Sequence, residues 1–184
     1  MKALCLIAVL ALSGSLASAQ TAPPTPAAPA APVAAPAAAP ATTAKPDLTG
    51  TWKLDVAKSN YDQIPPPSDE TLTFAQTGTT FSVATVSDND RGKEVYTLPF
   101  ATDGSETPTP KGVFADTATL QYLSTKGEWE GPALILTQKI LYQSSPGTLK
   151  STFTLSPDGK TLTRTMHISV DQGEFDTTSV YDKQ

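Results

Sequence analysis

From Asp47 onward, apolar and polar residues alternate in short runs that are separated by turn residues. The first run is Gly50–Val56, in which Trp52, Leu54 and Val56 alternate with polar residues. Alternation with a period of two is typical of a β-strand that has one buried face and one solvated face. On this pattern the chain is expected to form strands at 50–56, 70–76, 79–86, 93–101, 114–123, 132–141, 148–155, 161–169 and 174–181.

The residues between these runs indicate how the strands are connected. Gln76–Thr79 and Ser156–Lys160 are short enough for tight hairpins, with glycine supplying the positive φ that such turns need. The segment Asp103–Gly112, with two prolines, is expected to be a loop. Sequential short strands indicate an antiparallel meander, and open edges of a meander invite aggregation. We therefore predict one all-β domain at 47–184, an up-and-down β-barrel of about eight to nine strands, with a β-sandwich as the alternative.

The residues before this domain have a different composition. Residues 1–19 have the pattern of a secretory signal peptide: Lys2, the apolar run Ala3–Leu12, and the small residues Ala17–Ala19 before the expected cleavage site. Residues 20–46 are mostly alanine and proline, which predicts a disordered linker because they offer neither a core nor a helix. We expect an exported protein, periplasmic or extracellular, with no membrane span after cleavage.

Alternation also predicts which side chains point into the barrel. The expected inward-facing residues are Trp52, Leu54, Val56, Leu72, Phe74, Phe81, Val83, Tyr96, Leu98, Phe100, Leu120, Tyr122, Leu134, Leu136, Ile140, Leu149, Phe153, Leu155, Leu162, Arg164, Met166 and Ile168. Six of them are the candidate ligand-binding residues: Trp52, Phe74, Phe81, Tyr96, Tyr122 and Arg164.

Arg164 stands out because it shares its face with Leu162 and Met166. Burying a charge costs several kcal/mol unless the charge is paired or hydrogen-bonded. Three interpretations remain open. The guanidinium stacks on an aromatic ring and bonds backbone carbonyls at one end of the barrel, which closes that end; it meets an anionic group of a ligand; or the register is shifted by one residue and Arg164 is exposed.

The sequence Gly50-x-Trp52 at the start of the first strand, followed by a meander, resembles the calycin superfamily, which includes the lipocalins. Trp129–Leu134 and Ser156–Leu162 are similar to stretches of exported bacterial lipocalin-like proteins. The resemblance implies a barrel in which an arginine of a late strand packs over the tryptophan of the first strand. Arg164 and Trp52 would form that pair. It also implies that the barrel binds a small molecule.

The sequence offers little for catalysis or metal binding. His167 is the only histidine, and Cys5, the only cysteine, lies in the expected signal peptide. These counts exclude metal sites built on several imidazoles or thiolates, and a cysteine nucleophile, in the mature chain. Glu128 and Glu130 flank a tryptophan but lack the aromatic cleft of a glycosidase. We therefore expect neither an enzyme, nor a cofactor, nor a metal site.

The net charge of the chain limits which classes of binding partner are expected. Eighteen acidic residues against 13 basic ones give a net charge of −5, without a lysine or arginine cluster, which argues against nucleic acid. We predict a non-enzymatic binding module that holds a small apolar or amphipathic ligand. The alternative is a barrel filled by its own side chains that acts as a structural or protein-interaction domain of the cell envelope, with residues 20–46 as a spacer.

Overall fold

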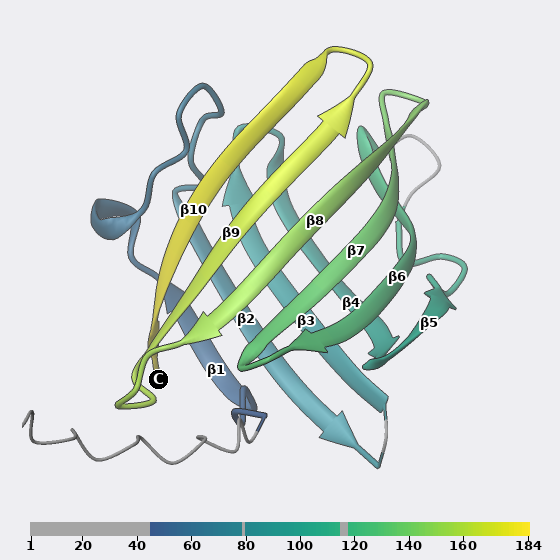
Figure 1. Ribbon diagram of the computed structural model, residues 1–184. Coiled ribbons are helices and arrows are strands. Elements are labelled where there is room, and N and C mark those ends of the chain that lie inside the picture. Colours follow the sequence, from purple (N-terminus) through teal and green to yellow (C-terminus); the bar gives the residue numbers. More distant parts are fainter. Residues whose placement is uncertain (1–44, 79, 115–117) are drawn as a thin grey trace, which may run out of the picture. The chain divides into compact units, whose positions relative to one another are not determined.

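The computed structural model describes residues 45–78, 80–114 and 118–184, which all belong to one unit spanning Pro40–Gln184. The expected signal peptide at 1–19 and nearly all of the expected linker at 20–46 lie outside the described residues. Within the described ranges, the chain forms ten strands and one short 3₁₀ helix (Figure 1). The elements are β1 (Gly50–Leu54), η1 (Val56–Lys58), β2 (Asp69–Thr77), β3 (Thr80–Asn89), β4 (Gly92–Ala101), β5 (Asp103–Pro108), β6 (Leu120–Glu130), β7 (Ala133–Tyr142), β8 (Ser145–Leu155), β9 (Thr161–Val170) and β10 (Gly173–Lys183).

All ten strands belong to one antiparallel sheet, in the order β4-β3-β2-β1-β10-β9-β8-β7-β6-β5. The sheet curls until β4 and β5, its two edges, lie next to each other (Figure 1). No ladder joins these two strands within the described ranges; instead the Ala101 N–H donates to the Thr107 hydroxyl at 3.3 Å. The up-and-down barrel predicted from the sequence is therefore confirmed, nearly closed and with one strand more than expected. The sandwich alternative does not apply, because there is one sheet.

Two expectations about individual segments are wrong. The expected loop at 103–112 contains β5, an edge strand without a buried side chain, so no apolar alternation marks it. The expected strand at 114–123 instead begins at Leu120 and runs to Glu130, although residues 115–117 lie outside the described part. A register shift between Tyr122 and Ser124 changes which residues face inward, and this interrupts the period of two.

Val56 is also misplaced by the alternation. It lies in η1 and is 39% exposed instead of pointing into the barrel. Asp55 is the cause, because its carboxylate accepts hydrogen bonds from the N–H groups of Ala57 and Lys58 and so turns the chain out of the strand.

The barrel has two unlike ends. The turns β2–β3, β6–β7 and β8–β9 form the end at the bottom of Figure 1, which we call the filled end. The turns β3–β4, β7–β8 and β9–β10 form the opposite end, the cavity end. The core lies toward the filled end and consists of Leu48, Trp52, Leu54, Leu72, Phe74, Val83, Leu98, Phe100, Leu134, Leu136, Phe153, Leu162 and Tyr181. Each large side chain buried there contributes about 1.5–3 kcal/mol.

Trp52 is completely enclosed within this core. Its indole N–H donates to the Leu48 carbonyl at 2.9 Å. The Lys183 ammonium lies 5.2 Å from the centre of its ring. The pairing of Arg164 with Trp52 that the calycin resemblance implies is therefore wrong: the cation over this tryptophan is a lysine of the last strand.

Within the described residues, no helix has the length and apolar character needed to cross a membrane.

Candidate ligand-binding cavity

The inward-facing residues of each strand lie in layers along the barrel axis. On β9, Leu162 belongs to the core, Arg164 lies one layer above it, and Met166 and Ile168 face a cavity. On β2 the residue numbers fall toward the cavity, so that Leu72 belongs to the core and Glu70 lies one layer above it. This layering follows from the period of two along a strand. It brings charged residues of β2 and β9 to one level, between the core and the cavity.

The cavity at this end has a volume of about 430 Å³. Apolar and aromatic side chains make up much of its wall, among them Leu120, Tyr122, Ile140, Leu149, Met166, Ile168 and Phe175. Small-molecule sites in proteins have volumes of about 300–1,000 Å³, with mostly apolar walls and a few placed polar groups. The core therefore fills the interior of the barrel at one end and leaves this cavity at the other. A second hollow, of about 590 Å³, lies at the filled end, with Leu48, Phe81 and Trp129 among its lining residues.

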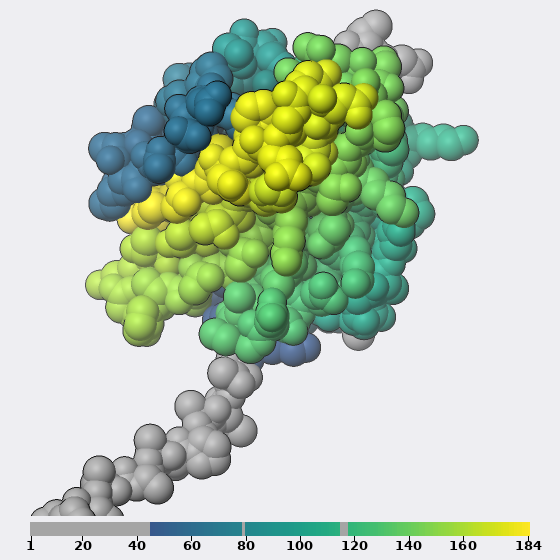
Figure 2. All heavy atoms as spheres, turned by 45° about the horizontal axis from the view of Figure 1, so that its top comes forward, coloured from purple at the N-terminus to yellow at the C-terminus, as the bar shows by residue number. Residues whose placement is uncertain are grey.

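The segment between η1 and β2 lies at the mouth of this cavity. Asn60 pairs with Thr178 of β10 through two backbone hydrogen bonds of 2.7 Å. Figure 2, in which the cavity end comes forward, shows this segment in blue beside the yellow β10. Tyr61, Ile64 and Pro67 of the segment contribute to the cavity wall.

A buried ion pair forms the floor of the cavity. Arg164 Nη2 lies 2.9 Å from Glu70 Oε1, and the two side chains are only 13% and 10% exposed. The Tyr181 hydroxyl donates to the same carboxylate oxygen, and the Arg164 guanidinium lies 5.3 Å from the Tyr181 ring centre. Ser179 bridges Arg164 at 3.4 Å to the Tyr61 hydroxyl at 2.9 Å. These five residues, Tyr61, Glu70, Arg164, Ser179 and Tyr181, are called the polar floor below.

Burial and neighbouring charges shift the pKa values of the residues in the polar floor. Burial is the largest single effect on the pKa of Arg164 and lowers it, but the Glu70 carboxylate and the hydroxyls of Tyr181, Tyr61 and Tyr96 together raise it by more, so the guanidinium stays charged. Burial raises the pKa of Tyr181 well above its ordinary value, which keeps its hydroxyl protonated and able to donate to Glu70. The sequence left three interpretations of Arg164 open. The structure places Arg164 inward, as the first interpretation expects. Its guanidinium stacks on the ring of Tyr181 where the resemblance implied Trp52, and it pairs with the Glu70 carboxylate where backbone carbonyls were expected.

Three aromatic rings cover the seam where β4 meets β6. Tyr96, Phe114 and Tyr122 have ring centres 5.2–5.6 Å apart, and the Tyr96 hydroxyl donates to that of Tyr122 at 3.4 Å. Burial raises the pKa of both tyrosines, that of Tyr96 well above its ordinary value. Both hydroxyls are therefore neutral hydrogen-bonding groups near pH 7.

A second set of charges lies at the mouth of the cavity. Arg91 Nε donates to Glu94 Oε1 at 3.0 Å, and Arg91 Nη1 lies 3.7 Å from Asp90 Oδ1. All three residues are part of the cavity wall. Both arginines of the wall are thus paired with carboxylates of the chain itself.

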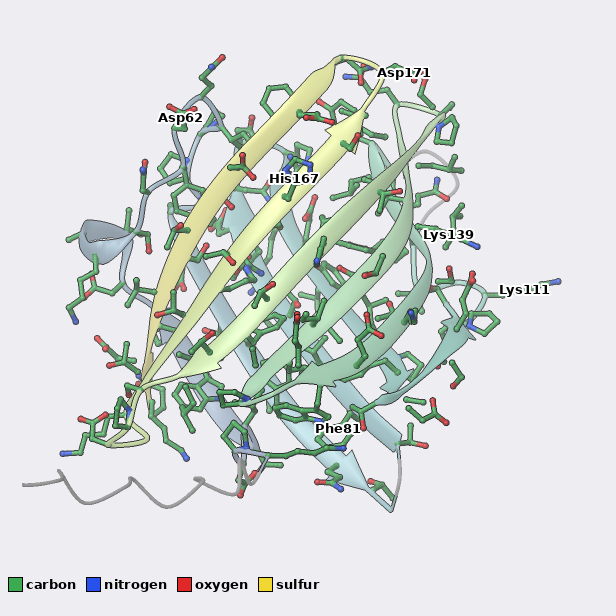
Figure 3. The ribbon with its side chains drawn as sticks, viewed as in Figure 1. Asp62, Phe81, Lys111, Lys139, His167 and Asp171 are labelled. Carbon is green, nitrogen blue, oxygen red and sulfur yellow. The ribbon has the colours of Figure 1, made fainter. Side chains whose placement is uncertain are left out.

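The six residues proposed from the sequence as ligand-binding separate into two groups. Tyr96, Tyr122 and Arg164 all lie in the cavity wall. Trp52 and Phe74 lie in the core instead. Phe81 stacks on Phe100 with ring centres 5.8 Å apart, and Figure 3 shows it at the filled end, far from Asp171 at the cavity end. The structure therefore brings together three of the six.

Glu70 and Thr177 are among the residues of the cavity wall that were missed from the sequence. The alternation could have identified both. Glu70 is two residues before Leu72, and Thr177 is four residues before Tyr181, so each shares a face with a core residue. Within the described ranges, no group of three or more histidine, cysteine, aspartate or glutamate side chains could hold a metal ion.

No protein-family model matches the sequence, and no curated protein matches it. Solved structures do resemble it. Zebrafish ileal bile acid-binding protein complexed with cholic acid is 17% identical, with 74% of this chain and 98% of that chain covered and a TM-score of 0.48. A Schistosoma mansoni fatty acid binding protein in complex with arachidonic acid is 14% identical, with 74% and 95% covered and a TM-score of 0.44. The cavity is therefore interpreted from the geometry of this chain alone.

Proposed function

We propose that this protein is a non-catalytic binding protein that holds one small apolar or amphipathic molecule in the cavity. The observation that carries the proposal is the hollow of about 430 Å³ above the polar floor. Leu162 and its neighbours pack the filled end, whereas the next layers of the same strands leave a space with apolar walls. An apolar molecule in that space removes both its own surface and the wall from water, which is the main driving force of such binding.

The charged groups of the cavity support binding over catalysis. A general base needs a free acceptor whose pKa lies near the working pH. The Glu70 carboxylate is engaged by Arg164 and Tyr181, and Glu94 is engaged by Arg91. His167 is outside the cavity, where its Nδ1 lies 2.8 Å from Asp176 Oδ1 on the outer face of the sheet.

Binding is tested with a neutral, environment-sensitive apolar dye, since Trp52 and Trp129 both lie outside the cavity wall and report on it poorly. We expect saturable binding of one dye per chain. The variant Ile168→Trp, which fills the cavity, is expected to weaken dye binding at least about tenfold. The matched control is Val95→Trp, because Val95 points outward and is exposed.

Two results would contradict the proposed function. One is the absence of saturable binding by the dye and by a panel of apolar and amphipathic compounds. The other is equal binding by Ile168→Trp and Val95→Trp, which would place the dye on the outer surface. Circular dichroism of both variants checks that the barrel is retained.

We also propose that the protein acts outside the cytoplasm. The charged and apolar pattern of residues 1–19, with its small residues at 17–19, supports export. Expression of the whole chain in a bacterium and N-terminal sequencing of the product outside the cytoplasm test this proposal. A product that keeps Met1 and stays in the cytoplasm would contradict it.

A further inference from the structure

We propose that the cavity selects a ligand whose polar end is uncharged and accepts hydrogen bonds, such as an alcohol, ketone, ester or primary amide, and that it discriminates against carboxylates. This inference rests on the proposed function, because it concerns the ligand of the same cavity. Two observations carry it. The arginines of the cavity are already neutralised by the chain, and two buried polar atoms beside them have no partner.

The charges of the cavity wall leave no free cation for a ligand anion. Arg164 is paired with Glu70, and Arg91 is paired with Glu94 and faces Asp90. These charged residues of the cavity wall comprise three carboxylates and two arginines, so their summed charge is negative. A carboxylate that enters must lose its water and then lie close to Glu70, whose charge repels it. Both effects oppose the binding of fatty acids and other anions.

In the cavity wall the unpartnered atoms are Arg164 Nε and Thr177 Oγ1, both enclosed by neighbouring atoms; a third such atom, Thr109 Oγ1, belongs to a residue outside the wall. In the β9–β10 ladder, Arg164 lies opposite Ser179 and Thr177 lies opposite Met166. Arg164 and Thr177 are therefore diagonal neighbours on the inner face of these two strands, and both belong to the cavity wall. Most buried polar atoms in native proteins do have a hydrogen-bond partner, so a pair without one calls for an explanation.

The hydrogen-bonding chemistry of Arg164 Nε and Thr177 Oγ1 determines which ligand group can be their partner. The Nε–H of an arginine only donates, so its partner must be an acceptor. The hydroxyl of Thr177 both donates and accepts. Once the two side chains turn toward the cavity, a neutral oxygen of a hydroxyl, ketone, ester or amide can satisfy the arginine without approaching Glu70 as a second negative charge. The apolar wall formed by Met166, Ile168 and Phe175 then encloses the hydrocarbon part of the same molecule.

The test compares compounds that share one carbon skeleton and differ at the polar end. Displacement of the neutral dye is measured with decan-1-ol, decanamide, methyl decanoate and decanoate at pH 8, where the acid is ionised. We expect the three neutral compounds to bind at least about tenfold more tightly than decanoate, because only decanoate carries a charge to the polar floor.

Two variants locate the cause of this preference. Glu70→Gln removes the competing carboxylate, so we expect decanoate to gain at least about tenfold relative to decan-1-ol. Thr177→Val keeps the shape of the side chain but removes its hydroxyl, and is expected to weaken decan-1-ol several-fold more than it weakens the neutral dye. Asp176→Asn on the outer face is the matched control and leaves all affinities unchanged.

The outcomes separate this inference from the proposed function. Decanoate binding as tightly as decan-1-ol and methyl decanoate in the unaltered protein would overturn the selection for neutral ligands and leave the binding cavity in place. Failure of the dye and of all four compounds to bind would overturn the proposed function itself. The comparison of methyl decanoate with decanoate needs no variant, so the inference stays testable even where Glu70→Gln fails to fold.

Discussion

Trp52 lies at the centre of the filled end, with its ring fully enclosed and its N–H bonded to the Leu48 carbonyl. Truncating such a side chain removes the burial of its ring and leaves a cavity. We expect Trp52→Ala to lower the free energy of unfolding by about 3–5 kcal/mol, measured by urea denaturation. Trp52→Phe keeps an aromatic ring and is expected to cost less. An unchanged melting temperature for Trp52→Ala would show that this tryptophan does not support the core.

The ion pair of the polar floor makes a second prediction at the scale of single residues. Glu70→Gln leaves the Arg164 guanidinium buried without its countercharge, which we expect to cost about 3–5 kcal/mol. The double variant Glu70→Gln with Arg164→Met should recover much of this loss, because an apolar replacement of both partners removes the uncompensated charge. Urea denaturation of the single and double variants measures both effects.

The control for this cycle is the exposed pair formed by Glu106 and Lys139. Water screens such a pair, so Glu106→Gln is expected to lower the free energy of unfolding far less than Glu70→Gln does. If Glu70→Gln is as mild as Glu106→Gln, the buried pair is not the structural floor described above.

Single elements could be predicted from the sequence where burial alternates cleanly. The apolar alternation identifies β2 and β8, because each has one face in the barrel and one in water. It fails at β5, which has no buried face, and in β6, where the register shift moves the alternation by one residue. On the seam, β4 was predicted from the sequence, whereas β5 and the course of β6 were not.

The candidate site could be predicted only in part, for a related reason. The alternation correctly turned Arg164 inward, but its partner Glu70 is 94 positions away in the chain. Two strands that are distant in sequence meet at one level only after the barrel closes through β1 and β10. Local patterns cannot carry that information, and so Trp52, the partner implied by the calycin resemblance, was the wrong one.

The seam between β4 and β6 leads to a prediction about an element. The backbone of β6 approaches the end of β4 so closely at Gly127 that an added Cβ would overlap the Ala101 carbonyl oxygen and lie 2.9 Å from Phe100 Cδ2. We expect Gly127→Ala to cost about 1–3 kcal/mol or more, because the clash involves backbone that cannot rotate away. Urea denaturation measures the cost, and Thr154→Ala on the exposed face of β8 is the control. A neutral Gly127→Ala would mean that this seam opens freely.

Four buried tyrosines make the stability of the whole molecule depend on pH. Burial raises the pKa of Tyr61, Tyr96, Tyr122 and Tyr181, which lie in the polar floor and along the seam. In the unfolded chain these phenols ionise near pH 10, whereas in the folded chain they keep their protons to higher pH. The folded state therefore binds more protons above about pH 10. The stability that they contribute is complete below that pH and is lost as the pH rises toward the folded pKa values.

We accordingly expect the free energy of unfolding to fall steeply above about pH 10, by up to about 1.4 kcal/mol per pH unit for each of these tyrosines. Urea denaturation between about pH 8 and 11.5 measures the slope, and tyrosinate absorbance shows when the phenols ionise. Lysines also titrate in this range, so the informative quantity is the difference between the unaltered protein and Tyr96→Phe, whose slope should be shallower by one tyrosine. Equal slopes, or ionisation of all tyrosines near pH 10 in the folded protein, would show that water reaches the polar floor and the seam.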